Sequence, residues 1–437
     1  MLENGTSARP AGRGFNNDES VRLQAHCPMV VTYAQALSIV EERIGGSNLR
    51  PPVETIPLDQ TPGRVLAEEV TADRDLPPFH RAIRDGYALR AADLNVLPAV
   101  LRRVGEVPAG RSFEGELNSG QCVSIMTGAP LPAGADAVVM VEHTRSLGDD
   151  IEIQRGVRQW ENVVLQGTEA AMGARLLPRG RRIRAAEIGL LATVGKATVA
   201  VYRRPSVAIL PTGDEVVPVQ QRPQWFQIRN SNAVTLAAQV NSAGGVPVQL
   251  GIAPDRKDVL REMIEQGLKS DLLLLSGGVS MGKFDLVEGV LAELGAEFFF
   301  QGVAIRPGKP LVFGRVRDLF FFGLPGNPVS TFVTFELFVR SALAMLGGAG
   351  FEPPIFLRAR LAKPCSQKTG LTAFMPARVW IRDSDPVVEP VGWQGSGDLV
   401  GIAAANCFLV IHPDQTELAA GDWVDVMPKE QGLGSRG

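Results

Sequence analysis

Three short glycine-rich segments contain the residues best suited to binding an anion. They are residues 211–215 (PTGDE), 276–282 (SGGVSMG) and 324–328 (LPGNP). Glycine lets the backbone approach a ligand closely and adopt positive φ, and free N–H groups at a helix start favour phosphate-like charge. Any single glycine turn could be plain strand-to-helix geometry, but three together indicate an anion site.

Two carboxylates, Asp214 and Asp285, lie on or beside two of these segments. If both face one edge of a sheet, they could share a hard divalent cation, which prefers carboxylate oxygens. Such a cation would neutralise a phosphoanhydride and polarise it for cleavage. Alternatively, Asp285 could cap the helix after Phe284, and Asp214 could hold its own turn. The pattern leaves both interpretations open.

Residues 306–310 (RPGKP) place two cations, Arg306 and Lys309, in a turn bounded by prolines. Proline fixes φ and glycine permits tight bending. A pair of solvated surface cations is the alternative, but the proline framing favours a fixed contact with an anion.

Residues 206–347 alternate between apolar strands and helices. Strands are expected at 207–210, 246–252, 271–275, 297–305, 311–315 and 319–322, and helices at 232–240, 257–268, 286–294 and 328–346. This alternation predicts a central three-layer α/β domain with an open, mostly parallel sheet. Ligands bind outside the carboxyl ends of such strands, so the three glycine-rich segments should meet at one edge. Ser231 and Asn327 are the expected N-caps of the first and last helix, with Pro328 at the first helical position.

The remaining parts of the chain are expected to be rich in β-structure. Short strands at 63–66, 100–104, 122–126, 137–141 and 151–153 and a helix at 185–191 describe the N-terminal part. Five short strands between 355 and 427 predict a small C-terminal β-barrel or sandwich. Thr32 is the expected N-cap of a helix at 33–44, and residues 1–29 are expected to form a flexible tail.

Composition excludes several classes of function. The net charge is −3 with both signs interspersed, unlike the basic footprint of a nucleic-acid binder. No segment is expected to reach the roughly 20 apolar residues of a membrane helix, and the N-terminus lacks the apolar stretch of a secretory signal. The four cysteines are scattered without a C-x-x-C pair, which argues against structural zinc and a disulfide framework. These features predict a cytoplasmic, multidomain protein that acts on small molecules.

Taken together, the motifs resemble the molybdopterin molybdenumtransferase family, which includes bacterial MoeA proteins and the E domain of gephyrin. The resemblance is carried by residues 212–215, 276–280 with Asp285, 306–310 and 324–330, and upstream by 76–79, 85–88, 126–132 and 134–139. It covers nearly everything from about residue 30 to 428. Single motifs are moderately specific, but this many in the family's order are strongly specific.

The resemblance implies a reaction in which adenylyl-molybdopterin and molybdate give molybdenum-molybdopterin and AMP, with magnesium (Mg²⁺) as the metal. It implies a homodimer whose active site lies between one subunit's α/β domain and elements of the other. Four domains follow the flexible tail: domain I at 30–72 and 170–204, domain II at 73–169, domain III at 205–349 and domain IV at 350–430. The upstream adenylyltransferase and recipient molybdoenzymes are the implied protein partners.

Residue roles are also carried over by motif match. Asp214 and Asp285 are the implied metal and catalytic residues, and Asp85 and Glu187 are further catalytic candidates in the first two domains. The implied substrate-binding residues are Thr127, Gly213, Ser276, Gly277, Gly278, Ser280, Gly326, Asn327, Arg306, Lys309, Ser330, Arg378 and Ser396.

Three departures from the family pattern affect this assignment. Residues 80–84 (HRAIR) replace an Asn-Ser-Ala-Met-type stretch, Arg306 replaces a lysine, and Glu169 stands in Gly-Thr-Glu where the family often has Gly-Glu-Asp. The basic side chains of 80–84 could face a phosphate or be solvated. Two other functions are alternatives: molybdopterin adenylyltransferase, whose family favours Thr-Gly-Gly-Thr-Gly where this chain has residues 276–280 (SGGVS), and a non-catalytic, gephyrin-like scaffold.

Overall fold

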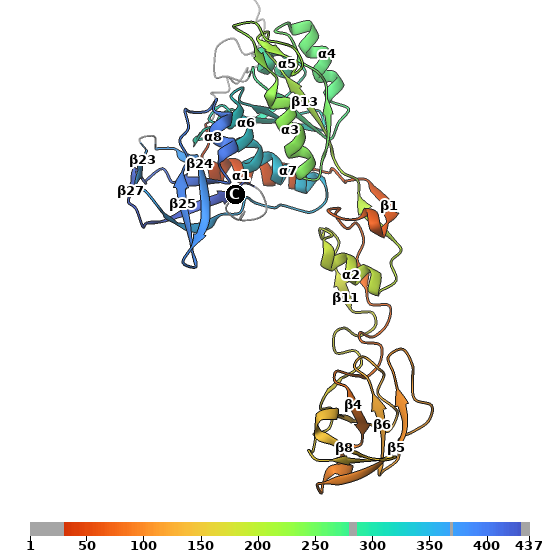
Figure 1. Ribbon diagram of the computed structural model, residues 1–437. Helices are drawn as coiled ribbons and strands as arrows, with labels where there is room; N and C mark the ends of the chain where they lie inside the picture. The colour runs from red at the N-terminus through yellow and green to blue at the C-terminus, as the bar shows by residue number, and fades with distance from the viewer. Residues whose placement is uncertain (1–29, 279–285, 368–369, 430–437) are drawn as a thin grey trace, which may run out of the picture.

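The structure is a computed structural model that describes residues 30–278, 286–367, 370–429. Two expected site residues, Ser280 and Asp285, and the expected tail at 1–29 lie outside the described residues. The chain forms an α/β body joined to a β-barrel, and a long arm carries a separate β-rich domain at its far end (Figure 1).

The α/β body is built on a six-stranded sheet of order β16-β13-β17-β21-β20-β18. Its strands are β16 (Val246–Gln249), β13 (Ser206–Pro211), β17 (Leu272–Ser276), β21 (Leu319–Leu324), β20 (Val312–Val316) and β18 (Glu297–Phe300). The first four pair in parallel, and β20 and β18 add antiparallel pairings. The predicted open, mostly parallel sheet is confirmed.

Helices cover both faces of this sheet. Successive side chains of a strand point to opposite faces, so apolar residues along a fully buried strand need a helical layer on each side. Val207 and Ile209 pack into one core with α3 (Ser231–Ser242) and α1 (Tyr33–Gly45). Ala208 and Leu210 pack into a second core with α4 (Lys257–Gly267) and α5 (Leu286–Glu293). The predicted three-layer arrangement is therefore confirmed.

Residues 328–346 form one long helix, made of α6 (Pro328–Thr334), a π-helical segment (Phe335–Val339) and α7 (Arg340–Leu346). By length and composition it could cross a membrane, contrary to the expectation that no segment comes near that length, but 78% of it is buried inside the protein. It packs against α3 and α1, so it is a core helix of the α/β body.

Cap predictions are partly confirmed. Thr32 caps α1 in a capping box with Gln35. The cap of α3 is Asn230, whose side chain accepts from the amide of Ala233, and Ser231 is already helical. The Ser231 prediction was wrong because an asparagine one residue earlier offers an equally good acceptor. Asn327 does occupy the N-cap position of α6, but its side chain makes no capping bond.

A closed β-barrel follows the α/β body. It consists of β24 (Thr372–Arg382), β25 (Asp385–Pro390), β22 (Leu357–Leu361), β28 (Trp423–Pro428) and β26 (Cys407–Ile411), and pairing between β24 and β26 closes it. Smaller elements are β23 (Cys365–Ser366), β27 (Glu417–Leu418) and α8 (Leu399–Ala404). Strand β19 (Ile305–Arg306) of the preceding segment pairs in parallel with β24, which attaches the cationic turn to the barrel.

The arm is formed by chain segments that run out and back. Its paired elements are β1 (Val53–Pro57) with β12 (Thr198–Tyr202) and β2 (Val70–Thr71) with β11 (Arg175–Leu177), next to α2 (Ala185–Thr193). The distal domain contains a sheet of order β7-β4-β6-β5-β9-β8, made of β7 (Ala137–Met140), β4 (Gly86–Leu89), β6 (Gln121–Ile125), β5 (Ala99–Val107), β9 (Asp150–Ile153) and β8 (Thr144–Leu147). Beside it, β3 (Arg81–Ala82) pairs with β10 (Val163–Val164). The strand expected at 63–66 is reduced to isolated bridges at Val65 and Leu66.

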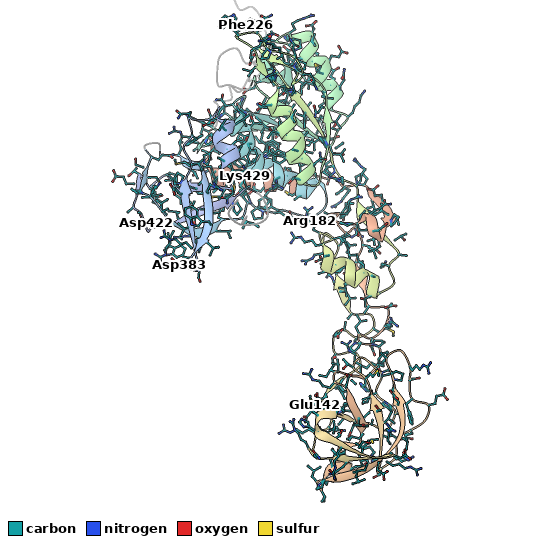
Figure 2. All side chains as sticks on the ribbon, viewed as in Figure 1. Glu142, Arg182, Phe226, Asp383, Asp422 and Lys429 are labelled. Carbon is teal, nitrogen blue, oxygen red and sulfur yellow. The ribbon has the colours of Figure 1, made fainter. Side chains whose placement is uncertain are left out.

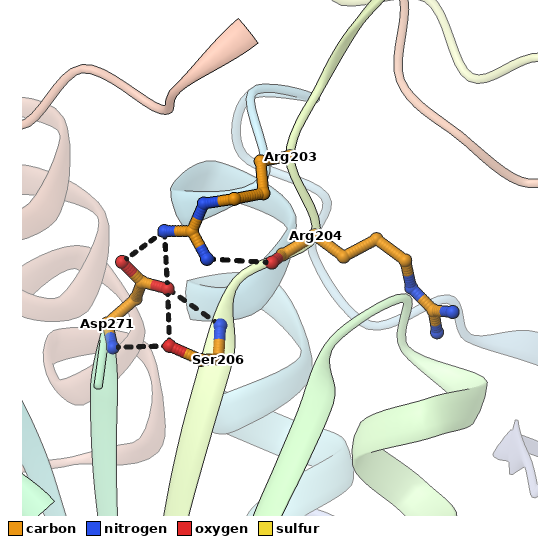
Figure 3. A network of polar contacts seen from close by, with 4 residues as sticks. All are labelled: Arg203, Arg204, Ser206 and Asp271. Carbon is orange, nitrogen blue, oxygen red and sulfur yellow. Dashed lines mark hydrogen bonds and ion pairs between the residues drawn. The ribbon is translucent and has the colours of Figure 1, made fainter. Parts of the chain in front are cut away.

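A polar network fixes the junction between arm and body, which we call the elbow (Figure 3). Arg203 donates to both carboxylate oxygens of Asp271 at 2.9 Å, and the amide and hydroxyl of Ser206 each donate to Oδ2 at 2.7 Å. Burial alone would raise the pKa of Asp271, but the bonds from Ser206 and Arg203 outweigh it and lower the pKa below its ordinary value. Arg204 donates to the carbonyls of Asn241, Gly244 and Gly245 on the body.

Candidate active site

The three glycine-rich segments meet at the carboxyl edge of the sheet. The amide of Thr212 donates to the carbonyl of Ser276 at 3.0 Å, and the amide of Gly277 donates to the carbonyl of Leu324 at 3.2 Å. The approach is so close that a Cβ on Gly277, whose φ is +92°, would lie 2.8 Å from the carbonyl oxygen of Thr212. The α carbon of Gly277 in turn lies 3.6 Å from the position that a Cβ on Gly326 would take. We call these converging segments the loop cluster.

One residue that sequence reasoning missed ties the loop cluster together. The side-chain amide of Asn232, in the first turn of α3, donates to Ser276 Oγ at 2.9 Å and to the carbonyl of Gly326 at 2.7 Å. The only local signal is its position at an expected helix start, which does not distinguish it from a capping residue. Its partners, however, are distant in sequence and only the fold reveals them.

Asp214 lies exposed at the rim of the loop cluster, where its Oδ1 accepts from the amide of Asp255 at 3.1 Å. Within the described ranges, no group of three or more His, Cys, Asp or Glu side chains could hold a metal ion. Because Asp285 is not described, a shared cation between it and Asp214 stays a prediction.

Thr212 adds a further polar group to the loop cluster. The residue is 5% exposed, and its hydroxyl would lie 2.8 Å from a Cβ on Gly278. Among the described residues this hydroxyl has no hydrogen-bond partner. An unsatisfied buried hydroxyl is costly, so Thr212 Oγ1 is suited to bind a ligand that enters between the loops.

The cationic turn lies beside helix α6. Pro307 and Gly308 are buried, and a Cβ on Gly308 would lie 2.6 Å from the Thr334 side chain, while Arg306 and Lys309 point outward and are exposed. Neither cation has an ion pair or side-chain hydrogen bond in the part of the chain that is described. Two fixed, unpaired cations are available to an anion.

Ser330 and Ser396 lie on or against the first turns of α6. Ser330 is buried, and its carbonyl accepts from Thr334 Oγ1. Ser396, which follows the barrel strands β24 and β25, accepts from Asn327 Nδ2 at 2.9 Å, and its carbonyl accepts from the amide of Val329. Arg378 is exposed on β24, opposite Glu389, and no contact with the loop cluster is found for it within the described residues.

Two of the remaining candidates lie in the distal domain. Asp85 Oδ1 accepts from the amide of Thr127 at 2.7 Å and from its hydroxyl at 2.9 Å. These bonds, the amide first, lower the pKa of Asp85 below its ordinary value, so this exposed carboxyl is ionised at neutral pH. Asp85 directly precedes β4 and Thr127 follows β6, and both strands lie in the distal domain at the far end of the arm (Figure 1).

Glu187 is held by structural contacts in the arm. Its Oε1 accepts from Arg181 at 2.9 and 2.6 Å, and its Oε2 accepts from the amide of Arg184 at 3.0 Å, which caps α2. The bonds from Arg181 contribute most to lowering the pKa of Glu187. A catalytic role for Glu187 stays a prediction, and its contacts favour a capping role.

Two of the basic residues at 80–84, where the sequence departs from the family pattern, contact other residues of the distal domain. Arg81 pairs with Glu169 at 2.9 Å, and His80 Nδ1 accepts from the amide of Gln166 at 2.9 Å. Arg84 is exposed. Two of the three basic residues therefore hold the distal domain's own loops, which leaves Arg84 as the candidate for a phosphate.

A cavity of about 370 Å³ lies at the elbow, lined among others by Arg50, Arg203, Asp271 and Arg317. It is at the amino ends of β13 and β17, opposite the loop cluster, and shares no lining residue with it. Asp271 is already saturated by its hydrogen bonds there. The loop cluster, with its converging glycine-rich segments and the unpartnered Thr212 hydroxyl, is therefore the better candidate for the active site.

Comparison with known proteins agrees with the fold. Residues 31–195 match the MoeA N-terminal region (domain I and II), residues 208–345 a "probable molybdopterin binding domain", and residues 358–429 the MoeA C-terminal region (domain IV). The molybdopterin molybdenumtransferase of Bacillus subtilis is 34% identical over 383 residues, which cover 86% of this chain and 89% of that protein. Its counterpart from Staphylococcus aureus is 33% identical and covers 92% and 98%.

Solved structures extend this likeness to three dimensions. Two crystal structures of the molybdopterin biosynthesis protein MoeA from Pyrococcus horikoshii match 92% of this chain and 100% of theirs. The TM-scores are 0.74 and 0.78, at 31% and 29% identity. The chain therefore belongs to the MoeA family of molybdopterin molybdenumtransferases, enzymes of molybdenum-cofactor biosynthesis.

Proposed function

We propose that the loop cluster and the cationic turn together convert adenylyl-molybdopterin and molybdate into molybdenum-molybdopterin and AMP. The observation that carries this proposal is the meeting of three glycine-rich segments at one sheet edge, from which helix α6 leads to a turn with two cations that are unpaired among the described residues. Close backbone approach and helix-start N–H groups suit phosphates, and a guanidinium with an ammonium suits a tetrahedral dianion.

Helix α6 separates the loop cluster from the cationic turn by a distance that would let one substrate reach both. It starts after Asn327 at the loop cluster and touches the cationic turn at Thr334. Seven residues at 1.5 Å each span about 10 Å. The phosphate end of the substrate would lie at the loops, and molybdate would bind Arg306, Lys309 and Ser330 near the dithiolene end. Ser396 would close the site from the barrel, and Arg378 is a more distant anion contact.

Asp214 and Asp285 are the residues proposed to hold Mg²⁺. The exposed Asp214 offers hard oxygen donors beside the glycine loops, and its Oδ2 accepts no hydrogen bond from the described residues. When bound, magnesium would neutralise and polarise the phosphoanhydride. The chain's own contribution is to fix the substrate's phosphates with the backbone amide of Gly326 and the hydroxyl of Thr212. Gly213 and Gly277 shape the loops, because their amides already donate to the carbonyls of Ala253 and Leu324.

We also propose a homodimer in which the distal domain completes the site of a second copy. Asp85 and Thr127 adjoin β4 and β6 of the distal domain, and these strands lie far from the α/β body of their own chain (Figure 1). Around them Phe79, Ile83, Met126 and Trp160 are 38–46% exposed. An exposed apolar patch around an ionised carboxyl is typical of a surface that another protein covers.

The chain would be organised into four domains, the first of which is discontinuous in sequence. The pairings of β1 with β12 and of β2 with β11 join residues 30–72 to 170–204, which supports a discontinuous domain I. Domain II would be 73–169, domain III 205–349 and domain IV 350–430. A cytoplasmic enzyme that receives its substrate from the adenylyltransferase and passes its product to molybdoenzymes fits this architecture.

The test is to incubate the purified chain with adenylyl-molybdopterin, magnesium and molybdate, and to measure AMP and molybdenum-loaded pterin. We expect both products from the parent and neither from Asp285→Asn. Lys309→Ala should raise the molybdate concentration needed for half-maximal rate. Lys269→Ala, an exposed lysine elsewhere on the body, is the control and should leave it unchanged. A parent that forms neither product would contradict the proposal.

A further inference from the structure

A long excursion leaves the loop cluster and returns to it. It starts after Glu215, passes through β14 (Val216–Val217), and comes back through β15 (Ile228–Arg229) to Asn232. Its base is closed because the carbonyl of Glu215 accepts from Ile228 at 2.9 Å and that of Val217 accepts from Asn230 at 2.8 Å. Since Asn232 binds Ser276 and Gly326, both ends of the excursion are anchored at the candidate active site.

Two aromatic rings project from the tip of this excursion. Trp225 is 96% exposed and Phe226 is 52% exposed, with their centroids 5.6 Å apart in an edge-to-face arrangement. A turn holds them, because Gln227 donates its amide to the carbonyl of Gln224 and accepts from the Gln224 amide through Oε1. Figure 2 shows Phe226 at the end of the α/β body that is farthest from the arm.

The charge of the excursion indicates what kind of molecule it receives. Residues 216–230 contain two arginines, Arg222 and Arg229, and no Asp or Glu. Both arginines are exposed, and neither has a side-chain partner among the described residues. An exposed indole beside unpaired guanidinium groups suits a planar ring that carries a phosphate.

We propose that Trp225 stacks on the planar heteroaromatic ring of the substrate. This inference rests on the proposed function, since adenylyl-molybdopterin carries two such rings, a pterin and an adenine. Residues 208–345, which include the excursion, match a molybdopterin-binding domain. Phe226 packs edge-to-face with the indole, and the 96% exposure of Trp225 leaves its ring accessible to the substrate. Arg222 and Arg229 attract the phosphates. Trp225 is therefore a binding residue that acts on affinity rather than on the chemical step.

The experiment measures binding to the full-length chain by calorimetry, with AMP in one arm and a free pterin in the other. Loss of base stacking on an aromatic ring typically weakens binding on the order of tenfold. We expect Trp225→Ala to raise the dissociation constant by that factor for the ring that stacks, and Trp225→Phe to restore most of the loss. Trp423→Ala is the matched control, because Trp423 is 41% exposed but lies on β28 of the barrel.

Turnover supplies a second readout. Trp225→Ala should raise KM for adenylyl-molybdopterin with kcat within about twofold, since a uniform binding contact changes KM alone. Equal dissociation constants in parent and Trp225→Ala for both compounds, or no binding of either by the parent, would overturn the proposal. So would a change from dimer to monomer with unaltered affinity, which would assign the excursion to contact between copies. A parent that binds AMP without turnover would contradict the proposed function, and the dissociation constants would still decide the role of Trp225.

Discussion

Replacing Asn232 by leucine should slow catalysis while leaving the fold intact. The side-chain amide of Asn232 makes two hydrogen bonds, to Ser276 Oγ and to the Gly326 carbonyl, and so fixes two glycine loops relative to α3. Neutral hydrogen bonds contribute about 1 kcal/mol each, so about 2 kcal/mol of loop alignment is at stake. If that alignment is used fully in the transition state, kcat/KM for AMP release should fall about 30-fold.

The variant Asn232→Asp tests whether the hydrogen bonds of Asn232, and not only the size of its side chain, hold the two glycine loops in place. Asn232→Asp is nearly isosteric, but a carboxylate cannot donate to the Gly326 carbonyl and places negative charge beside the proposed phosphate site. It should therefore be worse than Asn232→Leu, and added salt should partly restore it. Asn241→Leu, at the other end of the same helix and exposed, is the control. Activity of Asn232→Leu within threefold of the parent, measured by AMP release, would refute the reasoning.

Three further changes test the elbow, the glycine loops and the arm. The folded pKa of Asp271 is lowered, so its stabilisation is present above the ordinary carboxyl pKa of about 4 and is lost as pH falls through the folded value. Asp271→Asn should lower the melting temperature at pH 7, and the melting temperature of this variant should fall less between about pH 5 and 2 than that of the parent. An equal fall in both proteins would argue against a stabilising role for the Asp271 carboxylate. Gly277→Ala should reduce AMP release at least tenfold, because φ is +92° and the new Cβ meets backbone, whereas Gly289→Ala in α5 meets nothing within 4 Å and should be neutral. Glu187→Gln should cost about 1–2 kcal/mol of arm stability through its weakened cap while AMP release falls less than tenfold, and complete loss of turnover in a folded variant would restore the catalytic assignment.

The sequence was informative about the α/β sheet because its local signals agree with one another. Strands such as β17 are continuous apolar runs, and each is followed by a glycine turn and a helix start. The rule that ligands lie beyond the carboxyl ends of parallel strands predicts that residues 211–215, 276–282 and 324–328 meet at one edge. The structure brings their described parts, which end at residue 278 in the second segment, together there. The resemblance to a known family supplied the chemistry, which spacing alone left open.

Features that depend on long-range contacts were not predictable from the pattern. Asn232 has no distinctive neighbour in sequence, and its partners lie 44 and 94 residues away. Glu187 looked like a functional carboxyl, but only the fold shows Arg181 and the Arg184 amide saturating it. Asn327 satisfied the local rule for an N-cap, yet its side chain turns to Ser396 because the barrel packs against α6.

The elbow and the loop cluster are connected by the two central strands of the sheet. Strand β13 begins at Ser206, which binds Asp271, and leads into Thr212, while β17 begins directly after Asp271 and ends at Ser276. At about 3.3 Å per residue these strands are roughly 17–20 Å long, and every residue of β17 is buried. A buried strand of this kind cannot bend independently of its neighbours. The elbow and the loop cluster are therefore attached to opposite ends of the same two buried strands.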